Sequence, residues 1–185
     1  TKEKAVYLDI AHPDTTPERK ERNLRIIKDI LAKPTRKVGA NIVYDLDWLV
    51  NNMGIEVKGP FEDIQYAEPL IDEYRQSYSL SALAKIYGCE EKASDLLDMY
   101  CAKQGWKFKD AREHIWRMPA QAVARYAELD GMLPMQIIEK QREVISRQGL
   151  DEVYSIECRL IPLLIQMRKQ GVRLDMPRLK KTSLA

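Results

Sequence analysis

Acidic side chains occupy two places in the sequence where a carboxylate could take part in chemistry. Asp45 stands at the expected start of a helix just beyond an apolar strand, so the end of that strand would expose it at the edge of a sheet. Tyr126 and Asp130 lie four residues apart, which places a phenol and a carboxylate on one face of a second helix. The carboxyl end of a strand at a sheet edge is a position suited to chemistry.

Each position also has a purely structural interpretation. Asp45 in a first helical turn interacts favourably with the helix dipole. Asn41 is an ordinary turn residue, and helical Tyr/Asp pairs with the spacing of Tyr126 and Asp130 are common by chance. Neither position predicts a site when it is taken alone.

Taken together and in this order, the two motifs resemble a known pair. The pattern GxNxxYD at 39–45, followed by YxxxD at 126–130, is similar to the second and third exonuclease motifs of the DEDD superfamily, in the tyrosine branch that includes family A DNA polymerases and ribonuclease D. Residues 37–88 resemble the middle of the family A proofreading domain, and the stretch 75–88 is most similar to phage and prophage members. Residues 159–175 resemble the helix and extended segment that join this domain to the polymerase body, which argues against ribonuclease D.

The resemblance implies roles for individual residues in removing nucleotides from a single-stranded DNA 3′ end. Asp130 would ligate the Mg²⁺ or Mn²⁺ ion that activates water, Tyr126 would orient that water, and Asp45 would hold a second ion. Asn41 and Tyr44 would contact the DNA strand. A further acid, Asp63, matches a family position at a strand end, and we interpret it as structural rather than catalytic.

The first motif of the family, an Asp-x-Glu on the opening strand, does not precede Asn41. The nearest candidate is Asp9, but Ala11 stands two residues later, and this segment resembles a later strand of the domain. Two cations would bring about four positive charges against two carboxylates. We therefore expect little or no exonuclease activity from this chain alone. The alternatives are a non-catalytic nucleic-acid-binding or scaffolding module, and a truncated product with no role of its own.

Pro134 bears on the same site, because it lies four residues after Asp130. In a continuing helix its ring would collide with the Asp130 carbonyl, at a cost of roughly 3 kcal/mol or a kink. Gly131 adds flexibility, and Met132 stands where the family has a further acid. Either the kink is tolerated or the site has drifted.

The elements that must position these residues alternate between strand and helix in the first third of the chain. The sequence predicts a strand at 5–11, a helix from a Thr15–Glu18 capping box to Leu31, a strand tip at 37–41 and a helix from Tyr44 to Gly54. The later part favours helices: one capped by Ser79, one at 120–148 interrupted by Gly131 and Pro134, and one at 150–170 with a kink at Pro162 and a stop at Gly171.

These elements predict an α/β, ribonuclease H-like exonuclease fold that is rich in helix and lacks its first strands. Residues 1–148 form the partial exonuclease domain, and residues 149–185 form a linking helix and the start of a polymerase domain whose own motifs do not appear. A sheet without its opening strands would expose an unpaired edge, so a homo-oligomer formed through that edge is expected.

Composition adds limits rather than a function. The net charge of +2 over 185 residues makes any DNA contact local. The aromatic and basic segment at 106–117 could stack bases, but core tryptophans with solvated cations are the preferred interpretation. The apolar stripe of the helix at 150–170 is interpreted as core or domain interface, and His12 as a turn residue. Scattered cysteines favour a reducing cytoplasm, and neither a signal peptide nor a long apolar span is present.

Overall fold

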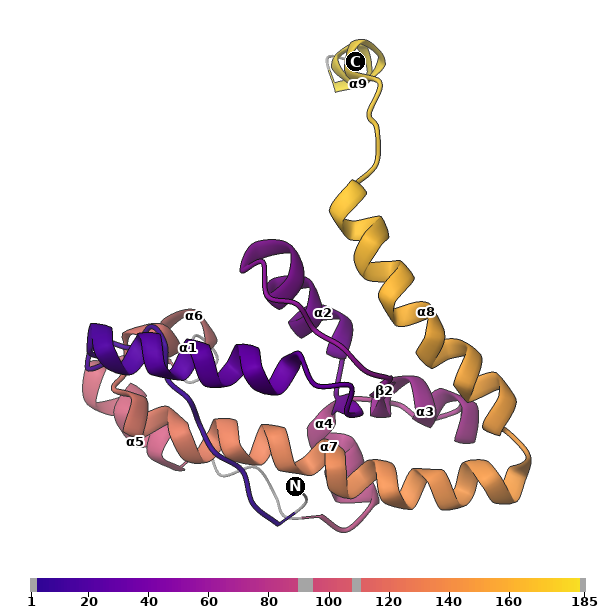
Figure 1. Ribbon diagram of the computed structural model, residues 1–185, viewed down its shortest axis with the longest axis horizontal. Helices are drawn as coiled ribbons and strands as arrows, with labels where there is room; N and C mark the ends of the chain where they lie inside the picture. The colour runs from indigo at the N-terminus through magenta and orange to yellow at the C-terminus, as the bar shows by residue number, and fades with distance from the viewer. Residues whose placement is uncertain (1–2, 90–94, 108–110, 184–185) are drawn as a thin grey trace.

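The computed structural model describes residues 3–89, 95–107 and 111–183 (Figure 1). It is rich in helix, with a small sheet between the early helices, and so confirms the expected helix-rich α/β class. The elements in chain order are α1 (Pro17–Leu31), β1 (Lys37–Gly39), α2 (Ile42–Asp47), β2 (Phe61–Asp63), α3 (Ile64–Ile71), α4 (Leu80–Ile86), α5 (Asp95–Gln104), α6 (Ala111–His114), α7 (Ala120–Gln148), α8 (Asp151–Gln170) and α9 (Met176–Ser183).

The sheet consists of β1 and β2, which run parallel, within the part of the chain that the structure describes. Lys37 pairs with Phe61 and Gly39 pairs with Asp63, so the carboxyl ends of both strands lie at the same edge. The α2 segment connects the two strands as a crossover, as parallel pairing requires.

The predicted strand at 5–11 is wrong. Residues 4–9 have no regular structure, and side chains rather than a neighbouring strand hold this segment. The Asp9 carbonyl accepts a hydrogen bond from Asn23 Nδ2 at 2.7 Å, and the Asp9 carboxylate accepts one from the Thr15 hydroxyl at 2.6 Å. The capping residue of α1 is Thr16 rather than Thr15, because Thr16 Oγ1 accepts from the Arg19 N–H.

His12 is more than the turn residue that its proline neighbour suggests. Its carbonyl does close a turn by accepting from the Thr15 N–H, but its side chain is buried. Nδ1 lies 2.7 Å from the Met118 carbonyl oxygen, and Nε2 contacts the Tyr7 hydroxyl. The ring therefore ties the N-terminal segment to the residues that lead into α7.

The turn between β1 and α2 needs unusual backbone geometry. Asn41 adopts a left-handed conformation with φ of 60°, and α2 begins immediately after it rather than at Tyr44. A Cβ added at Gly39 would lie 2.9 Å from Ile42 Cβ, so only glycine allows this close approach. After α2 the chain continues in a π-helical turn over Trp48–Asn52, and Gly54 follows it with φ of 64°.

The long helix α7 runs without interruption through Gly131 and Pro134, so the expected break is wrong. Pro134 has no N–H to donate to the Asp130 carbonyl, but the helix is held by its packing. Its fully buried side chains Leu133, Ile137 and Ile138 join a core cluster with residues of α3, α4 and α8. Tertiary packing thus outweighs the local helix-breaking signal at Gly131 and Pro134.

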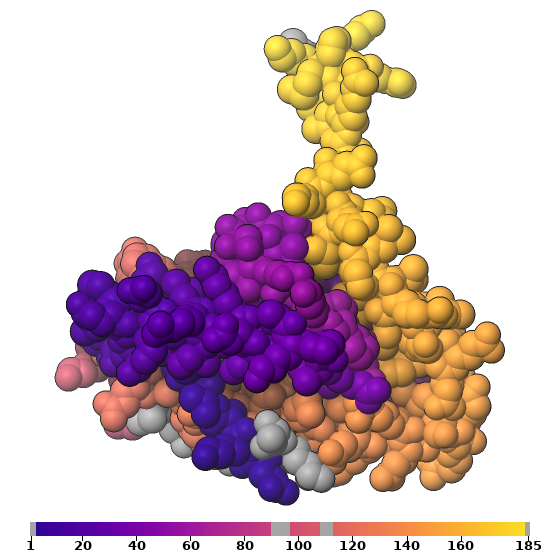
Figure 2. Space-filling view, viewed as in Figure 1, coloured from indigo at the N-terminus to yellow at the C-terminus, as the bar shows by residue number. Residues whose placement is uncertain are grey.

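The helix α8 buries a different face from the predicted stripe. Tyr154, Ile161 and Ile165 are buried, and the last two pack on the apolar side of α2. The predicted stripe is largely open to solvent, with exposed fractions of 36–58%, at Val153, Ile156, Leu160, Leu163 and Met167. Figure 2 shows the end of α8 and all of α9 standing out from the body of the molecule. No helix among the described residues is long and apolar enough to span a membrane.

The tryptophans of the aromatic and basic segment differ from each other. Trp106 is partly buried against the cluster that joins α5 to the start of α7, with its ring 4.5 Å from that of His114. Trp116 is 58% exposed, with the Arg117 guanidinium 4.7 Å from its ring centroid. The core interpretation is therefore confirmed for Trp106 and wrong for Trp116, while Phe108 and Lys109 lie outside the described residues.

Candidate active site

The edge where β1 and β2 end is organised by a buried carboxylate. Asp63 is fully buried, and its Oδ2 accepts a hydrogen bond of 2.6 Å from the Ile42 N–H. Its Oδ1 accepts one of 2.7 Å from the Gln65 N–H and thereby caps α3. Burial raises the pKa of Asp63, and these backbone donors offset the rise in part. Asp63 therefore joins the turn before α2 to the start of α3, which agrees with its structural interpretation.

Asp45 lies in the first turn of α2, next to this edge. The residue as a whole is exposed, yet desolvation of its carboxyl raises its pKa, and the charges of Asp63 and Asp130 raise it further. Asp130 is a half-buried residue of α7, far from Asp45 in the sequence. The fold thus brings the two predicted acids into one electrostatic neighbourhood.

The remaining predicted residues lie near these acids along the chain. Tyr126 lies one turn before Asp130 on α7 and packs in part against the cluster between α5 and α7. Asn41 is exposed at the turn before α2, and its side chain does not cap that helix. Tyr44 is 54% exposed on α2. Asn41 and Tyr44 are therefore accessible to a ligand that approaches the acids from solvent.

The donors at this edge do not fit a two-cation centre. No group of three or more His, Cys, Asp or Glu side chains in the described part of the chain is arranged to hold a metal ion. The Asp63 oxygens already accept hydrogen bonds from backbone N–H groups, so Asp45 and Asp130 are the carboxylates at this edge that could bind a metal ion. Two carboxylates balance only half the charge of two divalent cations.

Removing the Asp45 charge should stabilise the fold. Because the pKa of Asp45 is raised on folding, its contribution to stability is fully present below the unfolded pKa of about 4 and is lost as pH rises through the folded value. Solvent screening keeps the effect small, so Asp45→Asn should raise the melting midpoint at pH 7 by about 1–2 °C. Thermal denaturation followed by circular dichroism measures it, with Glu143→Gln on the exposed side of α7 as the control. An unchanged or lower midpoint in Asp45→Asn would contradict the repulsion between these acids.

A second buried carboxylate was not identified from the sequence. Glu68 on α3 is fully buried and receives hydrogen bonds from Arg75 Nε at 3.0 Å, the Tyr87 hydroxyl at 2.7 Å and Gln141 Nε2 at 2.8 Å. The available signal was a charged residue on the apolar face of a helix, four positions after the buried Ile64. This network fixes α7, and with it Asp130, against α3 and α4.

The comparison with protein families agrees with the class that this edge suggests. Residues 2–145 match the 3′–5′ exonuclease family of the DNA polymerase A type. The chain therefore belongs to this family, and its resemblance to the exonuclease domain of family A polymerases is confirmed.

Individual relatives are polymerases of bacterial viruses. The chain is 42% identical over 144 residues to the DNA-directed DNA polymerase of Pseudomonas phage M6, covering 77% of this chain and 21% of that protein. It is 33% identical over 152 residues to the DNA polymerase DpoZ of Salmonella phage PMBT28, covering 80% of this chain and 24% of that protein. A DNA polymerase DpoZ of Acinetobacter phage SH-Ab 15497 is 30% identical over 177 residues, covering 92% of this chain and 28% of that protein. The matched part of the chain thus spans 21–28% of the length of these relatives.

Proposed function

We propose that this chain is part of a phage-type family A DNA polymerase that works in the host cytoplasm. Residues 1–148 form the proofreading exonuclease part, and residues 149–185 form the connection to the polymerase domain. The family match ends at residue 145, near the end of α7, and the matched region is 21% of the length of the relative from Pseudomonas phage M6. The open apolar stripe on α8 supports a packing role against that further domain.

The exonuclease assignment rests on the family match over residues 2–145, and it is supported by the raised pKa of Asp45, which desolvation raises most and the charges of Asp63 and Asp130 raise further. Acids whose charges raise the pKa of a neighbouring carboxyl are typical of sites that bind cations. Exonucleases of this family use divalent metals, and in the parent polymerase Asp45 and Asp130 would contribute ligands to such a centre, while Tyr126, one turn before Asp130, would orient the attacking water. Asn41 and Tyr44, both exposed beside the acids, would contact the terminal nucleotides of single-stranded DNA.

The chain alone should show little or no hydrolysis, because its acids do not balance two cations. The test incubates the purified chain with 3′-labelled single-stranded DNA and Mn²⁺ and measures the released mononucleotide. We expect no release above a protein-free blank. Release that Asp130→Ala abolishes, while the exposed α7 variant Glu143→Ala retains it, would contradict this expectation and place an active centre in this chain.

The second candidate is a nucleic-acid-binding or scaffolding module that kept the fold and lost the chemistry. It is favoured by the absence of a metal-binding group of three side chains in the described ranges. A Mn²⁺ titration followed by electron paramagnetic resonance separates the candidates. Binding that Asp45→Asn and Asp130→Asn both weaken supports the exonuclease site, and DNA binding without any dependence on Mn²⁺ supports the module.

The small sheet also bears on assembly. With β1 and β2 as its strands over the described residues, we propose that an open strand edge pairs with a second copy of the chain. Sedimentation velocity across a range of concentrations tests this proposal. A strict monomer at every concentration would rule the pairing out.

A further inference from the structure

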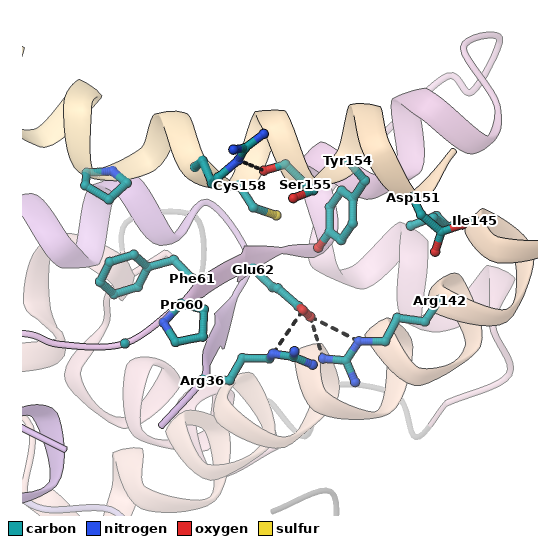
Figure 3. Close-up of a pocket in the computed structure, with 13 residues that line it drawn as sticks. Arg36, Pro60, Phe61, Glu62, Arg142, Ile145, Asp151, Tyr154, Ser155 and Cys158 are labelled. Atoms are coloured by element: carbon teal, nitrogen blue, oxygen red, sulfur yellow. Dashed lines mark hydrogen bonds and ion pairs between the residues drawn. The ribbon is translucent and has the colours of Figure 1, made fainter. Parts of the chain in front are cut away.

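A cleft of about 550 Å³ opens between β2, α7 and α8, away from the acids described above (Figure 3). It borders the amino end of β2, where Gly59 and Pro60 lead into the strand, whereas Asp63 stands at the carboxyl end. The cleft is therefore separate from the edge that carries Asp45.

Two arginines are held together on one side of this cleft. Glu62, whose side chain is 13% exposed, binds Arg36 Nε at 3.2 Å and Arg142 Nε at 3.1 Å, and it also contacts Arg142 Nη2. Arg36 precedes β1 and Arg142 belongs to α7, so the carboxylate draws two separate elements together. Figure 3 shows the two guanidinium groups side by side beneath Glu62.

This arrangement leaves positive charge facing the opening. One carboxylate neutralises one of the two guanidinium groups, and the arginine side chains are 52% and 37% exposed while Glu62 is nearly covered. Each guanidinium carries five N–H donors, and Glu62 engages only part of them. A second anion on the solvent side would complete the charge balance of the pair.

The opposite wall comes from the first half of α8. It adds Arg159, whose Nε donates to the Ser155 carbonyl at 3.3 Å, together with the Cys158 thiol. Asp151 is a second acid on the lining, so three arginines face two carboxylates and the lining keeps one net positive charge. Planar guanidinium forks match the oxygens of a phosphoryl group in a bidentate manner.

We infer that this cleft binds a phosphoryl group, contributed either by the backbone of a DNA strand or by a mononucleotide. Glu62 preorganises Arg36 and Arg142 for this purpose. The inference does not depend on catalysis at Asp45 and Asp130, because it concerns the other end of β2.

The experiment titrates the chain with inorganic phosphate, deoxyadenosine monophosphate and single-stranded DNA. It follows the arginine Nε–H resonances by nuclear magnetic resonance in the unmodified chain, so the first readout does not depend on the folding of any variant. We expect the Arg36 and Arg142 signals to shift with phosphate, and the affinity to fall roughly tenfold in Arg36→Gln and in Arg142→Gln. Arg25→Gln, exposed on α1 and outside the cleft, is the matched control and should bind as the unmodified chain does.

The three ligands distinguish the source of the phosphoryl group. A loss in the arginine variants for all three ligands assigns the cleft to the DNA backbone. A loss for phosphate and the mononucleotide alone assigns it to a small nucleotide. If the Nε–H signals do not shift with any ligand, or if both arginine variants bind every ligand as tightly as Arg25→Gln, the inference is overturned.

Discussion

Glu68→Ala should lower the free energy of unfolding by about 3 kcal/mol or more, because it removes the shared partner of a buried polar network. The Glu68 carboxylate is fully buried and accepts from Arg75, Tyr87 and Gln141. Gln141 is also fully buried, so its amide would lose a partner with no access to water. Urea denaturation at 25 °C, followed by circular dichroism, measures the loss.

Graded substitutions separate the network from the loss of volume. Glu68→Gln keeps the size and one acceptor oxygen, so it should lose less stability than Glu68→Ala. Glu73→Ala, an exposed neighbour on the following loop, should stay within about 0.5 kcal/mol of the unmodified chain. If Glu68→Ala behaves like Glu73→Ala, the network contributes nothing.

The Glu68→Ala substitution should also change the titration of Tyr87. Burial raises the pKa of Tyr87 well above its usual value, and the hydrogen bond to Glu68 raises it further. Loss of the Glu68 charge should therefore move the titration of Tyr87 back toward its ordinary pH range. An ultraviolet titration of tyrosinate, compared with that of Tyr87→Phe, isolates this group.

Three short-range signals in the sequence were reliable because the chemistry behind them is local. Ser79 caps α4 by accepting from the Ala82 N–H, as a serine before an apolar helix predicts. Gly171 ends α8 with a positive φ of 69°, which glycine adopts readily, and the strand tip before Asn41 forms β1. Each of these features depends on residues within a few positions of one another.

Long-range packing decided the features that the sequence could not predict. The continuity of α7 at Pro134 depends on burial against α3 and α4, which no local pattern reveals. Two apolar stripes run along α8, and periodicity cannot show that Ile161 and Ile165 are buried while Leu160 and Leu163 stay open.

The polar residues of the fold also include some that the sequence identified and some that it did not. The acids of the candidate site, Asp45 and Asp130, were identified through the order and spacing of two motifs. Glu68 and the Glu62–Arg142 pair were not, because their partners come from helices far along the chain. Polar groups that bind across the fold leave only a weak trace in a single sequence, namely a charge on an apolar face.

Asp63→Ala should also be strongly destabilising, by about 2–4 kcal/mol, because two backbone donors lose their partner at once. Asp63 caps α3 by accepting from the Gln65 N–H, and the loss of such a cap costs about 1 kcal/mol. The second donor, the Ile42 N–H, lies buried at the turn before α2. Asp63→Asn keeps one acceptor oxygen, so its stability should fall between that of Asp63→Ala and that of the unmodified chain. Urea denaturation gives the order, and equal stability of Asp63→Ala and the unmodified chain would contradict it.

The effect of Asp63 on its neighbour separates a merely structural role from an electrostatic one. The Asp63 charge raises the pKa of Asp45, so Asp63→Asn should lower that pKa even where the fold is intact. Nuclear magnetic resonance of the Asp45 carboxyl carbon against pH measures it. Because desolvation is the largest cause of the raised pKa, a residual elevation should persist in Asp63→Asn and fall again when Asp130→Asn is added. An Asp45 titration that neither substitution moves would mean that these three acids do not share one site.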